Sequence, residues 1–416
     1  MTRSHILYWI WLSLCVSPGS KYADVLLEGF EESAQKIYEA SKEDYDALDL
    51  PEDLKERLCR KGSEEPRKIL AWCKAHEVRM LAYDDPAFPA RLRRIPSRPV
   101  LLYCSGRNID LNDGVFIAMV GTRKMSSYGQ RTAYGIAHDA ACAGACIVSG
   151  MALGIDAVCH RGALDAGGDT VSVLGCGVDI AYPRQNLDLM LELEKKGLVV
   201  SEYKPGSRPT RFSFPIRNRI ISGLSQGTLA IEGGRDSGAM ITAKCAQSQG
   251  RDLFSLPGMV GEENSEGTNG LLREGAVPVT SAAELLSDYA LLYPDKIFLE
   301  RIPVYRPQIL LTPVPGKRPQ SARREENAPS EERPVKNDLS HTAQSPLPEP
   351  EKVAPEGLSD NCKAIFDLLN AEKQPLTADR ITELSGMSAS DVLTALTILE
   401  IKGAILSLPG GRFILS

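Results

Sequence analysis

The chain has 416 residues, enough for two or three domains with a sizeable core, and its shares of apolar (43%) and charged (25%) residues are ordinary for a globular protein. The formal net charge of -6 excludes a protein that is basic overall, so any binding site for an anion must be local. No stretch of the sequence reaches the roughly 20 apolar residues that a membrane-spanning helix needs, so no membrane partner is expected.

Ten cysteines are scattered along the chain. They form no Cys-x-x-Cys pair, and no Cys/His spacing matches a zinc site. Several of them, such as Cys142, Cys146 and Cys176, lie in apolar runs, as buried reduced thiols do. Because such thiols persist in reducing compartments, we expect a cytoplasmic protein without a metal site.

The N-terminus allows two interpretations. Arg3, the apolar run 6–16 and the small residues 17–20 together have the pattern of a secretory signal peptide. Trp9 and Trp11 also fit a buried first helix, and the absence of a disulfide-like cysteine framework favours that helix.

Residues 5 to about 75 are predicted as short helices. Their apolar positions recur near helical spacing, and Pro51, Gly62 and Pro66 interrupt the pattern. We therefore expect an N-terminal helical domain at residues 1–75, similar to SAM or helix-hairpin-helix domains.

The pattern then changes to strands, with apolar runs at Met80–Tyr83 and Val100–Tyr103. From residue 115 to about 290, short apolar runs alternate with helical segments, which is typical of a parallel sheet covered on both faces. In such a sheet the ligand crevice lies beyond the carboxyl ends of the strands. We predict an α/β fold with an extended Rossmann-like parallel sheet at residues 76–300, with strands at Val115–Val120, Cys146–Val148, Thr170–Leu174, Leu198–Ser201, Thr228–Ile231 and Asp252–Leu256, and helices at Tyr128–Gly144, Asp156–Ala166, Asn186–Lys196 and Ala239–Gln249.

The C-terminal part is predicted as a linker followed by a small domain. Residues 301–356 are rich in proline and charge and poor in aromatics, which predicts a disordered or extended linker. Residues 357–416 contain three helical segments, at Asn361–Leu369, Thr377–Ser385 and Ser388–Lys402, and then a hairpin of Ile405–Leu408 and Arg412–Leu415. Three helices and a hairpin indicate a winged-helix domain.

Small residues and hydroxyls follow four of the predicted strands. Glycines let backbone N–H groups approach an anion, and helix N-termini add partial positive charge. Four such loops at one edge of a sheet favour a phosphate-lined crevice, and the alternative is that the glycines only make tight turns. The candidate residues are Gly121, Thr122, Arg123, Ser126, Ser149, Gly150, Ser237 and Gly238.

The segment Gly175-Cys176-Gly177 is not a dinucleotide-binding fingerprint. The third glycine position is Ile180, and Tyr182-Pro183 interrupts the helix that should follow. No cofactor is expected.

The segment Tyr203–Ile231 combines cations with aromatic rings. It contains no Asp or Glu, and Phe212 and Phe214 lie beside its arginines. Single-stranded nucleic acid needs charge for its phosphates and a flat face for an unstacked base. The alternative is a solvated charged turn with core phenylalanines. The cations are Lys204, Arg208, Arg211, Arg217 and Arg219.

The sequence offers no clear group of catalytic residues. His138 and His160 lie in predicted helices without an evident nucleophile partner, so a structural role is favoured for both. Asp156 and His160 could pair on a helix face, and Glu232 at a strand end is expected to bond loop amides rather than act as an acid. We expect no catalytic residue and no enzyme activity.

Taken together, these residues resemble the DNA-processing protein A family, also called DprA or Smf. The resemblance is strong over about residues 80 to 290 and looser at both ends. It rests on the ordered segments GTRKMSSYG (121–129), SGMALGIDAVCHRGAL (149–164), VLGCGVDIAYPRQN (173–186), FPIRNRIISGLS (214–225), SGAMITAKCA (237–246) and GTNGLLREGA (267–276).

The resemblance implies a homodimer that binds single-stranded DNA, protects incoming DNA and passes it to a RecA-type recombinase during natural transformation. It also implies that Arg123 meets a phosphate and that Phe214 stacks on a base. The remaining contacts would come from the basic pocket of Arg211, Arg217, Asn218 and Arg219, and from the amides at Ser237 and Gly238.

Three features of this chain differ from what the family resemblance implies about DNA contacts. The family often has Arg where this chain has Leu153, and Ser where it has Ala239, and each difference removes a possible contact. The C-terminal domain resembles the winged helix often appended to the family, but residues 357–416 hold five basic and seven acidic residues. A DNA-reading winged helix usually carries Lys and Arg on its third helix. We therefore expect a protein-docking or weakly DNA-contacting module.

The alternative function is a nucleotide phosphoribohydrolase on the same Rossmann-like scaffold. The fold and the glycine loops permit it. Those enzymes resemble one another in a Pro-Gly-Gly-x-Gly-Thr turn followed by a glutamate, whereas this chain has Ile231-Glu232-Gly233-Gly234-Arg235-Asp236.

Overall fold

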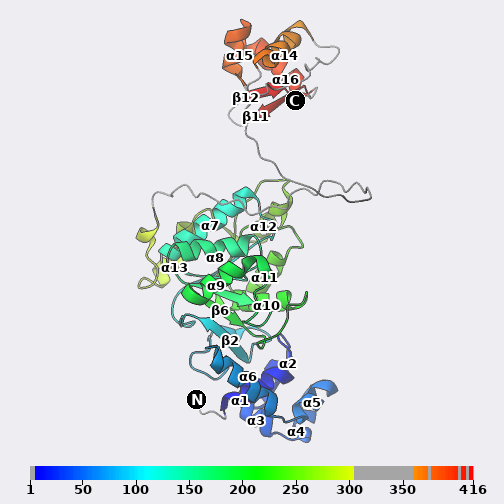
Figure 1. Cartoon of the computed structure of the whole chain (residues 1–416), viewed down its shortest axis with the longest axis vertical. Coiled ribbons are helices and arrows are strands. Elements are labelled where there is room, and N and C mark those ends of the chain that lie inside the picture. Colours follow the sequence, from blue (N-terminus) through cyan, green and yellow to red (C-terminus); the bar gives the residue numbers. More distant parts are fainter. Residues whose placement is uncertain (1–4, 304–358, 373–375, 402–403, 409–411, 416) are drawn as a thin grey trace, which may run out of the picture. The chain divides into compact units, whose positions relative to one another are not determined.

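The computed structural model describes residues 5–303, 359–372, 376–401, 404–408 and 412–415 (Figure 1). The chain divides into two compact units, Met1–Pro313 and Val314–Ser416. Each unit is described by itself. The predicted linker falls outside the described residues from residue 304 to 356, and the predicted domain boundaries remain predictions.

A mixed, mainly parallel sheet forms the centre of the first unit. Its order in the described chain is β1-β2-β6-β5-β4-β3-β7-β8-β9. The seven strands β6, β5, β4, β3, β7, β8 and β9 run parallel to one another. Strands β1 and β2 form an antiparallel edge next to β6. The strands are β1 Arg79–Ala82, β2 Leu101–Gly106, β3 Phe116–Val120, β4 Cys146–Ser149, β5 Thr170–Leu174, β6 Leu198–Ser201, β7 Gly227–Ala230, β8 Asp252–Ser255 and β9 Val277–Pro278.

Helices cover both faces of this sheet. Side chains alternate between the faces of a strand, and both sets on β3 are apolar and buried. Phe116 and Ala118 belong to the core shared with α10 and α11, whereas Ile117 and Met119 pack with α7, α8 and α13. The helices are α7 Ser127–Cys142, α8 Ile155–Asp165, α9 Leu187–Lys196, α10 Ser213–Leu224, α11 Gly238–Ser248, α12 Glu263–Arg273 and α13 Ala282–Leu292, with short 3-10 turns at Leu92–Arg94, Arg184–Asn186 and Leu299–Arg301. The predicted Rossmann-like fold is confirmed.

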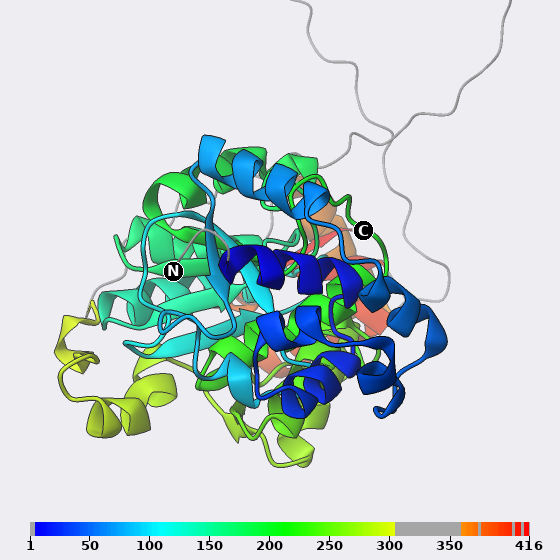
Figure 2. The same ribbon diagram turned by 90° about the horizontal axis from the view of Figure 1, so that it is seen from below.

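Short helices precede the sheet, as predicted, and they pack onto it within the same unit (Figure 2). Trp9 and Trp11 are buried in α1, so the interpretation of this segment as a buried helix is confirmed. The core of these helices is continuous with one face of the sheet. They are α1 His5–Cys15, α2 Tyr22–Gly29, α3 Ala34–Glu39, α4 Lys42–Asp46, α5 Glu52–Cys59 and α6 Glu64–Ala75.

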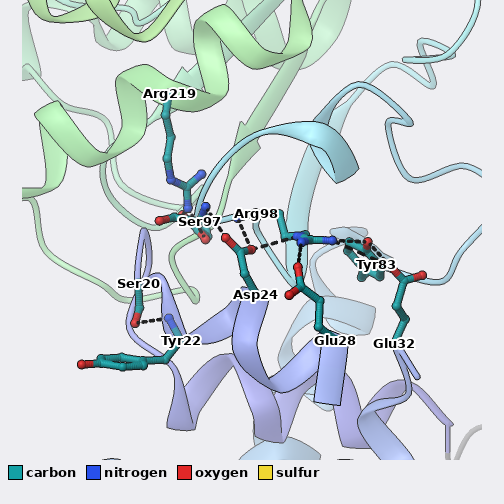
Figure 3. Close-up of polar contacts among 10 residues, drawn as sticks. Ser20, Tyr22, Asp24, Glu28, Glu32, Tyr83, Ser97, Arg98 and Arg219 are labelled. Carbon is teal, nitrogen blue, oxygen red and sulfur yellow. Dashed lines mark hydrogen bonds and ion pairs between the residues drawn. The ribbon is translucent and has the colours of Figure 1, made fainter. Parts of the chain in front are cut away.

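An ion-pair cluster joins α2 to the sheet domain (Figure 3). The Arg98 guanidinium lies 2.9 Å from Asp24 Oδ1 and 2.6 Å from Glu28 Oε1. The backbone N–H groups of Ser97 and Arg98 also donate to the Asp24 carboxylate, at 2.7 and 3.1 Å. The helical domain is therefore fixed to the sheet by polar contacts as well as by a shared core.

The second unit has the predicted winged-helix elements. Its helices are α14 Asp360–Glu372, α15 Ala378–Ser385 and α16 Ala389–Ile401, and β11 Ile405–Leu408 pairs with β12 Arg412–Leu415. The short strand β10, Leu376–Thr377, pairs with β12 and was not predicted. The N–H of Asp391 donates to the Ser388 hydroxyl at 3.2 Å, which caps α16. Across the described ranges, no helix is both long and apolar enough to cross a membrane.

Candidate nucleic-acid interface

A pocket of about 630 Å³ lies beyond the carboxyl ends of the central strands. From β3 the chain continues to β4 on one side and later returns as β7 on the other side. Open α/β sheets bind ligands at such a switch in strand order. The walls are the loops after β3, β4, β5 and β6 and the first turns of α10 and α11. Helices α10 and α11 lie close together in Figure 1.

The structure brings nine of the thirteen predicted site residues into this pocket. They are Gly121, Thr122, Arg123, Arg211, Phe214, Arg217, Asn218, Ser237 and Gly238. Ser126, Ser149, Gly150 and Arg219 lie nearby but do not line it. The lining also includes Lys124, Asp156, Tyr182, Thr210 and Ile241, which were not predicted as site residues.

An aromatic face forms part of the pocket wall. The ring of Phe214 lies 5.3 Å from the ring of Tyr182, at an interplanar angle of 26°. The Arg123 guanidinium carbon lies 5.4 Å from the centroid of Phe214. A flat π face with a neighbouring guanidinium is what an unstacked base and its phosphate require.

The cations of the rim reach solvent. Arg123 and Lys124 are exposed in the loop after β3, and Arg211 is exposed just before α10. The Arg211 guanidinium carbon lies 4.6 Å from the centroid of Phe212. In the described part of the chain, neither Arg208 nor Arg211 forms an ion pair with a carboxylate, so both charges remain available to an anion.

The N-terminus of α11 faces the same space. Ser237 is extended at the N-cap position, and Ser237, Gly238 and Ala239 all line the pocket. The first N–H groups of a helix have no partner within the helix and carry partial positive charge. This turn therefore offers backbone donors to a phosphate beside Arg123.

Arg217 is a buried support for the pocket rather than an exposed cation. Its Nη1 donates to the carbonyl of Gly150 at 2.6 Å and to that of Val173, and its Nε donates to Asn218 Oδ1 at 3.1 Å. Burial lowers the pKa of Arg217, and the charge of Asp156 opposes that shift. Arg217 thus holds the loop after β4 to β5 and leaves little of its charge for a ligand.

Asp156 lies in the floor of the pocket. Its Oδ2 accepts the N–H groups of Gly150 at 3.2 Å and Ala152 at 3.4 Å. Burial raises the pKa of Asp156, and the Arg217 guanidinium counteracts this effect. The two opposite charges stabilise each other inside the protein.

The other predicted loop residues shape the strand ends. The Ser149 hydroxyl donates to the Met119 carbonyl at 2.7 Å. The Ser126 hydroxyl caps α7 by accepting the Gly129 N–H at 3.0 Å. A Cβ at Gly150 would overlap the Arg217 guanidinium, so the close packing of that side chain requires glycine.

Arg219 points away from the pocket, toward the N-terminal helices (Figure 3). Its Nη2 lies 2.7 Å from both carboxylate oxygens of Glu202. Lys204 is likewise paired, with Glu65 of α6 at 2.9 Å. Both acidic partners lie outside the segment Tyr203–Ile231, so the charge of that segment overstates the charge of the pocket.

Glu232 supports a loop, as expected. Its carboxylate accepts the Ser126 N–H at 2.9 Å and the Ser126 hydroxyl. Its backbone carbonyl accepts the Thr122 N–H at 2.7 Å. Glu232 does not line the pocket.

His138 has a thiol neighbour, Cys142, that was not predicted from the sequence. The Sγ of Cys142 lies 3.8 Å from His138 Nδ1. Burial raises the pKa of the Cys142 thiol, which opposes formation of a nucleophilic thiolate. The pair lies at the end of α7 opposite the pocket, so it takes no part in the site.

His160 is buried and structural. The Thr170 hydroxyl donates to the Ile147 carbonyl at 2.8 Å, so Thr170 Oγ1 accepts the proton on His160 Nδ1 at 2.7 Å. Burial, together with the charge of Arg217, lowers the pKa of His160 to about 3. The folded protein therefore holds a neutral imidazole near neutral pH.

This neutral imidazole predicts a loss of stability in acid. Below pH of about 6.5 the unfolded chain binds a proton on His160 that the folded chain does not bind, down to pH of about 3. The free energy of unfolding should therefore decrease as the pH is lowered from about 6.5 to about 3. This group contributes a decrease of up to about 1.4 kcal/mol per pH unit. Urea denaturation at several pH values measures the slope. His160→Gln should give a shallower slope, and an unchanged slope would contradict this assignment.

Comparisons with known proteins agree with this architecture. The sequence model of the family DNA recombination-mediator protein A matches residues 79–290, and that of the DprA winged helix domain matches residues 349–411. Protein Smf of Synechocystis sp. is 32% identical over 422 residues, which cover 99% of both chains. DNA processing protein DprA of Streptococcus pneumoniae is 39% identical over 209 residues, which cover 49% of this chain and 72% of the relative.

A solved structure gives the same result. The X-ray structure of DprA from Streptococcus pneumoniae superposes with a TM-score of 0.59 and 31% identity, and covers 69% of this chain and 98% of that chain. The family match spans half of this sequence, and one relative aligns over nearly its whole length. The chain belongs to the DNA recombination-mediator protein A family, whose members carry the names DprA and Smf.

Proposed function

We propose that this protein binds single-stranded DNA in the pocket beyond β3, without a strong preference for sequence. Phosphates would meet Arg123, Arg211 and the N-terminus of α11, and a base would stack on Phe214. The observation that carries the proposal is the Phe214 ring with the Arg123 guanidinium 5.4 Å away. A π face accepts any base, whereas hydrogen bonds to base edges would select one base.

The pocket favours an unpaired strand over a duplex. A base inside a duplex is stacked on both faces and cannot present a face to Phe214. In a single strand, the free-energy cost of turning one base outward is small. The pocket has a volume of about 630 Å³, so we expect it to take a single base turned out of the strand rather than a stacked base pair.

We propose binding without catalysis, and no cofactor. Glu232, the acid that the sequence suggested, is engaged by Ser126 and lies outside the pocket lining. Asp156 does line the pocket, but its carboxylate accepts the N–H groups of Gly150 and Ala152. This arrangement supports binding over the phosphoribohydrolase alternative.

In the cell, the proposed role is to protect incoming DNA and to help load a RecA-type recombinase during natural transformation. Membership of a recombination-mediator family supports this role. The protein would act as a homodimer in the cytoplasm. The winged helix would serve as a docking module or a weak DNA contact, because its third helix, α16, carries Asp391 and Glu400 and no Lys or Arg.

Equilibrium binding to labelled oligonucleotides tests the proposal. Fluorescence anisotropy should show tight binding to oligothymidine and much weaker binding to a duplex of equal length. Added salt should weaken binding, with a logarithmic slope of about -0.7 for each phosphate neutralised on a single strand. Equal affinity for both forms, or no salt dependence, would refute the proposed mode.

A further inference from the structure

An exposed aromatic ring stands beside the pocket without lining it. Phe212 is 64% exposed, more than any other aromatic side chain described here. The Arg211 guanidinium carbon lies 4.6 Å from its centroid. An apolar ring so open to water, with a cation beside it, is the arrangement that binds a stacked base and its phosphate.

The N-terminal helical domain reaches α10 next to this ring. The turn at residues 17–20 packs on Ile216, and Gly19 has a φ of +73°. A Cβ at Gly19 would lie only 2.6 Å from Ile216 Cγ2, so this approach requires glycine. Ile216 lies four residues after Phe212, which places it about one helical turn, or ~6 Å, along the same face.

A second aromatic and cation pair follows this turn directly. The Lys21 ammonium lies 5.2 Å from the centroid of the Tyr22 ring. The Tyr22 N–H donates to the Ser20 hydroxyl at 3.3 Å, which fixes the start of α2. The Tyr22 ring points away from Asp24 and Glu28 (Figure 3).

The carboxylates near Tyr22 are already paired. Arg98 lies within 2.9 Å of both Asp24 and Glu28 and 3.8 Å from Glu32. In the ranges that the structure describes, Lys21 has no carboxylate partner. A phosphate that approaches Tyr22 therefore meets a free ammonium and carboxylates whose charge Arg98 offsets.

We propose that the DNA strand leaves the pocket over Phe212 and continues onto the N-terminal helical domain at Tyr22. The outer track, defined as Lys21, Tyr22, Arg211 and Phe212, would stack bases on its two rings and hold phosphates with its two cations. This proposal rests on the proposed function, because the strand is the one that Phe214 holds in the pocket. It assigns the helical domain a direct part in DNA binding.

Oligonucleotides of two lengths separate the outer track from the pocket. Probes are labelled oligothymidines of about 6 and about 20 nucleotides, which bracket the site sizes of single-strand binding modules. The variants Phe212→Leu and Tyr22→Leu keep apolar bulk and remove the aromatic face. Each should leave the affinity for the short probe unchanged and weaken binding of the long probe about fivefold or more. The variant Phe214→Ala should weaken both probes.

The chain offers a matched control. Phe298 forms a similar pair with Arg301, whose guanidinium carbon lies 3.9 Å from the ring. The Phe298 N–H donates to the Ala143 carbonyl, at the end of α7 opposite the pocket. Phe298→Leu should bind both probes as the wild type does, and thermal melting confirms that each variant is folded.

Photo-crosslinking of the wild-type protein gives a test without substitutions. An oligothymidine with 5-iodouracil at successive positions should crosslink to Phe214 at one position and to Tyr22 a few nucleotides away. If Phe214→Ala weakens binding while Tyr22 never crosslinks and both leucine variants bind the long probe normally, the outer track is wrong and the pocket stands. If Phe214→Ala has no effect on the short probe, the proposed function itself fails. Capture of an acidic peptide in place of the long probe would also overturn the outer track.

Discussion

Arg217→Ala is expected to lower the free energy of unfolding by about 3–5 kcal/mol, because it leaves two buried carbonyls without their donor and removes the positive charge near the buried Asp156 carboxylate. The two carbonyls are those of Gly150 and Val173. The ends of β4 and β5, beside the pocket, would lose their common partner. Urea denaturation monitored by circular dichroism measures the loss.

The exposed Arg211 provides the control for Arg217. Arg211→Ala removes the same charge from the same segment but from the surface, so its effect on stability should stay within about 0.5 kcal/mol. For DNA affinity the order should be reversed. Among folded molecules, Arg211→Ala should weaken binding more than Arg217→Ala does, because Arg211 faces the ligand. If Arg217→Ala were as stable as the wild type and lost only DNA binding, Arg217 would be a ligand contact and not a support.

Phe214→Ala is expected to weaken binding of oligothymidine by about 1–3 kcal/mol, which is roughly 5- to 150-fold. The ring supplies the π face of the pocket, and its removal also releases the neighbouring Arg123 and Tyr182. Arg123→Glu should weaken binding too and should flatten the salt dependence, because a phosphate contact becomes a repulsion. Fluorescence anisotropy measures both variants.

Arg301→Glu is a matched control for Arg123→Glu. It makes the same charge change beside Phe298, at the opposite end of the sheet domain. Affinity should be near that of the wild type. If Phe214→Ala and Arg123→Glu, both folded, bound the strand normally, the pocket would not be the DNA site.

The parallel sheet and its loops were predictable because their signals are local. Strand β3 is apolar at every position from Phe116 to Val120, since helices cover both of its faces. The glycines and hydroxyls after such runs mark strand ends, and parallel strands end at one edge. Gly121, Thr122, Arg123, Ser237 and Gly238 follow such strand ends, and all five line the pocket.

Helix α10 was not predicted, and this omission affected the interpretation of its arginines. Its residues were instead predicted as part of a basic segment that contacts single-stranded nucleic acid. Ile220, Ile221 and Leu224 are buried at helical spacing, and this period was the available signal. Pro215 lies in the first turn, where its missing N–H costs nothing.

Long-range contacts decide which of the cations face the ligand, and no local pattern reveals them. Arg217 is enclosed by the loop after β4, and Arg219 is paired with Glu202. Tyr182 reaches the pocket from a loop whose sequence indicated only an interrupted helix. In each case the partner is set by the fold and not by neighbouring residues.

A crystal structure of the protein with a bound oligothymidine tests the central claim most directly. The account predicts a phosphate between Arg123 and the first turn of α11 and a base stacked on Phe214. A strand bound only to another surface, such as the winged helix, with the pocket beyond β3 left empty, would contradict it.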